Sequence, residues 1–117
     1  MEINDIIETA KKIAIKLQEL SCAKIEILDI SKKSTQIKVL VLANAENAQI
    51  SKVIAGDLKL FLQEQNITCI GVDGGLKGEW IVFDCDKIMV HLFTEATRTK
   101  FNLEKLWKDS KNVVKWR

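Results

Sequence analysis

The sequence predicts an α/β protein in which a mixed β-sheet of about five strands is flanked by helices. Apolar residues recur every three or four positions over residues 4 to 20 and again over residues 44 to 65, as in amphipathic helices. Between them, residues 39 to 43 are apolar at every position, which is typical of a strand covered on both faces. Residues 78 to 93 hold two apolar runs around a four-residue polar turn, the pattern of a β-hairpin. We therefore expect helices on both sides of the sheet.

The first half of the chain is predicted to be a helix followed by two strands. The helix covers residues 4 to 20, with Asn4 as its cap. The strands cover residues 24 to 30 and 36 to 43, and the polar loop between them is residues 31 to 35.

The second half is predicted to continue with a helix, a strand, the hairpin and a last helix. The helix that follows Asn44 has an apolar stripe made of Ile50, Val53, Ile54, Leu58, Phe61 and Leu62. A strand is expected over residues 67 to 72, and the glycines of residues 71 to 78 mark a flexible loop without a phosphate-binding motif. Asn102 is predicted to cap a helix from Leu103 to about residue 111, which a tail follows.

Length and composition limit the classes of protein to consider. The 117 residues predict a single domain over 1–117, and 47% hydrophobic residues are enough for a core. A net charge of +2 gives little support to nucleic-acid binding through bulk electrostatics. No apolar run approaches the roughly 20 residues that cross a bilayer, and the start of the chain is acidic. We expect a cytoplasmic protein with no membrane contact.

The sequence predicts no catalytic, metal-binding or cofactor-binding residue. Cys22, Cys69 and Cys85 are widely spaced and form no Cys-x-x-Cys pair, so three reduced thiols are expected, at least two of them in the core. With a single histidine and no nucleophile elbow, an acyl-transfer triad cannot be assembled. That histidine, His91, shares strand parity with Met89, and we expect it to be half-buried and satisfied by a backbone group.

Several segments together resemble the ribosomal silencing factor family, also called the Iojap-like family. The resemblance covers nearly the whole chain. Its motifs are Leu28-Asp29-Ile30, Ile70-Gly71-Val72-Asp73-Gly74, Trp80-Ile81-Val82-Phe83-Asp84, Val90-His91-Leu92-Phe93, Glu95, Arg98, Phe101 and Leu103-Glu104-Lys105-Leu106-Trp107.

The resemblance implies a nucleotidyltransferase-like topology without an enzymatic activity. It implies a protein that binds the large ribosomal subunit through an interface-side ribosomal protein, number fourteen of the large-subunit series, and blocks joining of the small subunit. Such a factor represses translation, and in some relatives it assists late large-subunit assembly. No small-molecule substrate or cofactor is implied.

The chain departs from the family pattern mainly in its first half. Residues 36 to 39 and 44 to 47 replace a family aspartate and a threonine-glycine loop, and Ala48-Gln49 stand where the family has an arginine. In the hairpin turn, Asp86 occupies the position of a family glycine. Aspartate tolerates left-handed backbone angles, so we expect the turn to persist.

Strand alternation predicts a binding face on the first hairpin strand. Trp80, Val82 and Asp84 project to one side of it. Trp80 is the expected partner anchor, and the alternative is that it packs under the first helix. Asp84 either forms a salt bridge with a basic partner or caps its own turn.

Glu95 and Arg98 complete the predicted partner-binding residues. They lie three positions apart, so they either pair with each other on a helix or face the partner. The free protein could also form a homodimer through the exposed hairpin face. Two other classes remain open: a metal-dependent nucleotidyltransferase-like enzyme using Asp84 and Asp86, and a module that binds ribosomal RNA through the basic tail.

Overall fold

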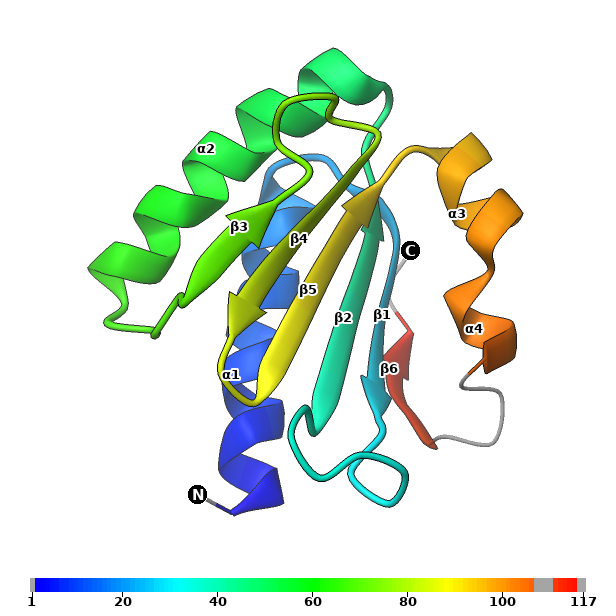
Figure 1. Ribbon diagram of the computed structural model, residues 1–117. Coiled ribbons are helices and arrows are strands. Elements are labelled where there is room, and N and C mark those ends of the chain that lie inside the picture. The colour runs from blue at the N-terminus through cyan, green and yellow to red at the C-terminus, as the bar shows by residue number, and fades with distance from the viewer. Residues whose placement is uncertain (1, 107–110, 116–117) are drawn as a thin grey trace.

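The computed structural model describes residues 2–106 and 111–115, and it folds them into a mixed sheet with helices on both faces (Figure 1). No helix among these residues is long and apolar enough to span a bilayer. In chain order the elements are α1 (Ile3–Glu19), β1 (Ala23–Asp29), β2 (Val39–Asn44), α2 (Ala48–Glu64), β3 (Gly71–Asp73), β4 (Trp80–Cys85), β5 (Ile88–Phe93), α3 (Glu95–Phe101), α4 (Leu103–Leu106) and β6 (Lys111–Lys115).

The strands form one six-stranded sheet in the order β3-β4-β5-β2-β1-β6. The central pair, β2 and β5, is parallel, and the other pairs are antiparallel. The α/β prediction with a mixed sheet is thus confirmed. The prediction of a tail near the C-terminus is wrong for residues 111–115. These residues pair with β1 as an additional edge strand. This strand holds two valines among polar residues, so the sequence pattern gave no strand signal there.

Each face of the sheet carries its own apolar cluster. The main cluster lies under α1 and α2, which pack on one face, and it includes both buried cysteines, Cys22 and Cys85. The smaller cluster on the opposite face contains Leu28, Leu40, Leu42 and Phe93, with Leu103 of α4 packed against it. Figure 1 shows α1 and α2 behind the sheet and α3 and α4 beside its other face. No helix of residues 2–106 lies over the front of β3, β4 and β5 (Figure 1).

The helix prediction needs two corrections. Asn4 lies inside α1, whose cap is Glu2 without a side-chain hydrogen bond. The stripe predicted for α2 is wrong at Ile50 and Val53, which are 40% and 63% exposed. The residues of α2 that face the sheet are instead Ser51, Ile54, Leu58 and Leu62. At 100° per residue, Val53 lies nearly opposite this set.

Two further elements are shorter than the sequence indicated. The strand expected over residues 67–72 reduces to β3, Gly71–Asp73, at the edge of the sheet. The last helix is divided into α3 and α4, and its predicted continuation through residues 107–110 lies outside the described residues. Asn102 ends α3 with a φ of +45°, and its side chain accepts the N–H of Lys105 at 3.2 Å. Its predicted role as the cap of the following helix is confirmed.

Gly74 allows the β3–β4 loop to pass close to the first residue of β4. Its φ is +83°, and a Cβ there would overlap the carbonyl oxygen of Trp80. We expect Gly74→Ala to lower the free energy of unfolding by about 2 kcal/mol, because left-handed strain and the clash add. Gly75 has no atom within 4 Å of such a Cβ. In urea titrations of both variants, Gly75→Ala should stay within about 0.5 kcal/mol of the wild type. Equal stability of the two would contradict this account.

Candidate partner-binding face

Strand β4 presents two different faces, as its alternation predicted. Trp80, Val82 and Asp84 are half-buried, whereas Ile81 and Phe83 are fully buried under the helices. Cross-strand pairing places Met89 of β5 opposite Asp84 and places Asp73 of β3 opposite Val82. Paired residues of antiparallel strands project to the same side of a sheet. We call the surface formed by Asp73, Trp80, Val82, Asp84 and Met89 the outer face.

Trp80 lies at one end of the outer face and is surrounded by aromatic rings. Its ring centroid is 5.6 Å from that of Phe93 and 4.8 Å from that of Phe101. Its indole N–H donates to Nδ1 of His91 at 2.9 Å. Trp80 therefore packs against the smaller apolar cluster. The alternative that it packs under the first helix is wrong, because α1 covers the opposite face of the sheet.

His91 stands beneath this tryptophan in the middle of the sheet. It shares its face with Met89 and Phe93, as expected, but it is only 7% exposed. The prediction of a backbone partner is corrected by the hydrogen bond from Trp80. Burial lowers the pKa of His91 from 6.5 to about 4. The imidazole is therefore neutral at pH 7, and its Nδ1 can accept the hydrogen bond from Trp80.

Asp84 supports the hairpin turn at the other end of the outer face. Its Oδ1 accepts the backbone N–H of Asp86 at 3.2 Å. Asp86 has a φ of +68°, so it takes the left-handed angles expected of it. The turn-capping alternative for Asp84 is thus observed. A contact with a partner stays a prediction.

Glu95 opens helix α3 and lies on the surface, where it links three elements. Its Oε1 accepts Lys24 Nζ at 2.6 Å, and its Oε2 accepts Asn44 Nδ2 at 2.6 Å. The hydrogen bond from Lys24 is the main cause that lowers the pKa of Glu95. The carboxylate is therefore charged and held beside the ends of β1 and β2 at neutral pH.

Arg98 differs from the expectation that it faces a partner. It is 6% exposed, and its Nη2 forms an ion pair with Glu26 Oε2 at 2.7 Å. Its Nη1 donates to the carbonyl oxygen of Lys24 at 2.6 Å and to Asn44 Oδ1 at 2.8 Å. A guanidinium with five donors suits such a buried set of acceptors. As described, Arg98 ties α3 to β1 and β2 and does not reach the surface.

Sequence reasoning missed the residues that support the predicted ones. Glu26 lies in the buried middle of strand β1, and a buried charge there implies a cationic partner. That signal indicates a partner of opposite charge, but it does not identify Arg98 as that partner. Phe101 is 52% exposed, and the sequence marked it only as one of the residues that carry the family resemblance. Its contact with Trp80 depends on how α3 returns over the sheet, which no local pattern encodes.

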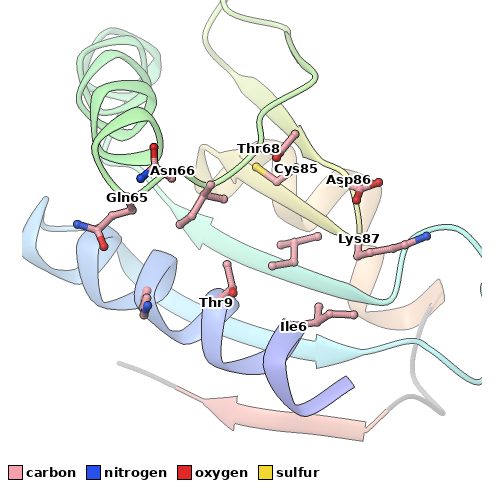
Figure 2. Close-up of a pocket in the computed structure, with 11 residues that line it drawn as sticks. Ile6, Thr9, Gln65, Asn66, Thr68, Cys85, Asp86 and Lys87 are labelled. Atoms are coloured by element: carbon pink, nitrogen blue, oxygen red, sulfur yellow. The ribbon is translucent and has the colours of Figure 1, made fainter. Parts of the chain in front are cut away.

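A pocket of about 230 Å³ lies away from the outer face. It is formed by the early turns of α1, the end of α2 and the β4–β5 turn, and Thr9, Gln65, Cys85 and Asp86 are among its lining residues (Figure 2). None of the five predicted partner-binding residues lines it. In the part of the chain that the structure describes, no three His, Cys, Asp or Glu side chains converge as metal ligands would.

The fold is that of a small α/β protein, and it places Trp80 on the outer face of the sheet. The family model "Ribosomal silencing factor during starvation" matches residues 3–116. The chain therefore belongs to the ribosomal silencing factor family, whose role is the regulation of translation.

Individual relatives agree with this assignment. The chain is similar to ribosomal silencing factor RsfS of Chromobacterium violaceum, with 29% identity over 108 residues that cover 92% of this chain and 85% of that protein. It is 37% identical over 62 residues to RsfS of Halalkalibacterium halodurans, covering 53% of each. A crystal structure of a C. violaceum protein superposes with a TM-score of 0.81 at 28% identity, over 92% of this chain and 88% of that one.

Proposed function

We propose that this protein binds the large ribosomal subunit in the cytoplasm through the interface-side ribosomal protein number fourteen, and so blocks joining of the small subunit. It represses translation by occupying the interface, without catalysis, cofactor or small-molecule substrate. The observation that carries the proposal is the outer face. Among the residues that the structure describes, no helix lies over it, and it presents a fixed tryptophan at one end, with apolar and acidic side chains farther along.

The chemistry of the outer face favours a protein partner over RNA. Val82 and Met89 are half-buried and apolar, and Phe101 adds exposed ring surface beside Trp80. Asp73 and Asp84 place carboxylates along the same face. Carboxylates repel a phosphate backbone and complement lysine and arginine, so a basic protein surface with an apolar contact point fits this face.

The remaining predicted residues receive different roles in this proposal. Glu95 lies on the surface at the start of α3 and contributes a charged contact at the edge of the interface. Arg98 acts through its buried ion pair by holding α3, and therefore Phe101, against the sheet. When the ribosome is absent, a second copy of the chain would cover the same face as a homodimer.

Cosedimentation with purified ribosomal subunits tests the proposal. The wild-type protein should pellet with large subunits and stay in the supernatant with small subunits. Added to a mixture of both, it should lower the light scattering that reports subunit joining. Binding to small subunits, or undiminished joining at saturating protein, would refute it.

Truncation of Trp80 should weaken this binding strongly. We expect Trp80→Ala to cost about 2 kcal/mol of binding free energy, roughly a 30-fold loss of affinity, because anchor tryptophans dominate interfaces. Leu60→Ala is the matched control, since Leu60 is 59% exposed on α2 behind the sheet. Affinities measured by cosedimentation should fall only for the first variant, with folding checked by circular dichroism. Equal losses for both variants would remove Trp80 as the anchor.

A further inference from the structure

The indole N–H of Trp80 is already used inside the protein. It donates to Nδ1 of His91 at 2.9 Å, and that imidazole is 7% exposed. An indole has only this one donor and no acceptor. Trp80 therefore presents ring carbons, and no free N–H, to whatever contacts the outer face.

We propose that His91 is the positioning residue of the outer face: its Nδ1 fixes the indole of Trp80, so that the partner protein places an apolar side chain on the ring. The choice of partner rests on the function proposed above. The positioning of Trp80 rests only on contacts within this chain.

The rings around Trp80 limit its position but do not define it alone. They lie at tilted angles of 35° for Phe93 and 44° for Phe101 and His91. Phe101 is 52% exposed, so one side of the enclosure can give way. The hydrogen bond adds a directional contact that ring packing lacks. A side chain fixed before binding loses less conformational entropy when the partner arrives.

The surroundings of the ring also indicate what it meets. Val82 and Met89 continue the apolar surface from Trp80 along the outer face. A partner group that needs a hydrogen-bond donor would find none on the indole. An apolar side chain needs no hydrogen bond there, and its contact with the indole removes apolar surface of both groups from water.

Nuclear magnetic resonance of the indole N–H tests the positioning directly. The chain has three tryptophans, and Trp80→Phe identifies the signal of Trp80. His91→Asn retains an oxygen acceptor near the position of Nδ1, whereas His91→Leu, of similar shape, retains none. We expect exchange of the Trp80 N–H with water to be at least about tenfold faster in His91→Leu than in the wild type, and His91→Asn to stay near the wild type. Unchanged exchange in His91→Leu would overturn the proposal.

Affinity for purified large subunits tests the chemistry of the contact. Trp80→Phe and His91→Leu each remove the hydrogen bond between Trp80 and His91 but keep an aromatic ring at position 80, so each should bind about tenfold more weakly than the wild type, whereas His91→Asn should recover most of the loss. The double variant with both changes should lose no more than about tenfold, because both act through one hydrogen bond. Additive losses, about a hundredfold in the double variant, would show that the two residues do not act through this bond, and would overturn the inference. If the wild type does not bind at all, the proposed function fails, and the exchange rates still decide the role of His91.

Discussion

Replacing Arg98 by methionine is expected to destabilise the fold by about 3–5 kcal/mol. The guanidinium is 6% exposed and pairs with Glu26, which is 9% exposed. Removing it takes this ion pair away from the buried carboxylate, and a carbonyl oxygen and an amide oxygen each lose a hydrogen bond from the guanidinium. Urea unfolding followed by circular dichroism measures the loss.

A double variant separates the stability lost with the ion pair from the stability lost with side-chain packing. In Arg98→Met combined with Glu26→Met, neither charge remains, and apolar side chains of similar length fill the space. We expect this double variant to regain at least about half of the stability that the single variant loses. A single variant that loses less than about 1 kcal/mol would show that the buried pair contributes little.

Acid is expected to destabilise the protein through His91. Its folded pKa is lowered from 6.5 to about 4, because burial disfavours the imidazolium. Between these values the unfolded chain binds a proton that the folded chain does not, so stability rises with pH in this window. The stability that the neutral imidazole of His91 preserves is fully present above pH 6.5 and is lost as the pH falls towards 4. The difference of about 2.5 pKa units corresponds to about 3 kcal/mol.

The comparison that isolates His91 is the His91→Asn variant, which has no titrating group at this position. Urea unfolding of both proteins at pH 7 and pH 4 measures how far the free energy of unfolding falls between these pH values. We expect the fall to be about 3 kcal/mol larger in the wild type than in the variant. Protonation would also remove the acceptor for the indole of Trp80. Parallel losses in the two proteins would mean that His91 does not control the acid response.

The sequence predicted those parts of the fold that local patterns specify. The hairpin strands β4 and β5 and the long helices α1 and α2 appear within a few residues of their expected bounds, because their apolar periodicities are strong. The edge strands β3 and β6 were misjudged. An edge strand pairs on one side only and needs little apolar content, so its sequence resembles a loop.

In the candidate site, too, local patterns predicted some features correctly, whereas features set by tertiary contacts were missed. Alternation along β4 placed Trp80, Val82 and Asp84 on one face correctly, since a period of two follows from strand geometry alone. The role of Arg98 depends on Glu26, which is 72 residues away in sequence. The acceptor for the indole of Trp80 depends on cross-strand register between β4 and β5. Such contacts are set by tertiary packing, so single-residue reasoning could not assign them.

Site-specific crosslinking on purified large subunits tests the central claim most directly. A photoreactive phenylalanine derivative at Val82 would sit on the outer face, and the same group at Leu60 would sit behind the sheet on α2. We predict that position 82 crosslinks to a ribosomal protein of the subunit interface, identified by mass spectrometry, and that position 60 does not. Crosslinks from position 82 to ribosomal RNA alone, or from position 60 to the interface protein, would contradict the account.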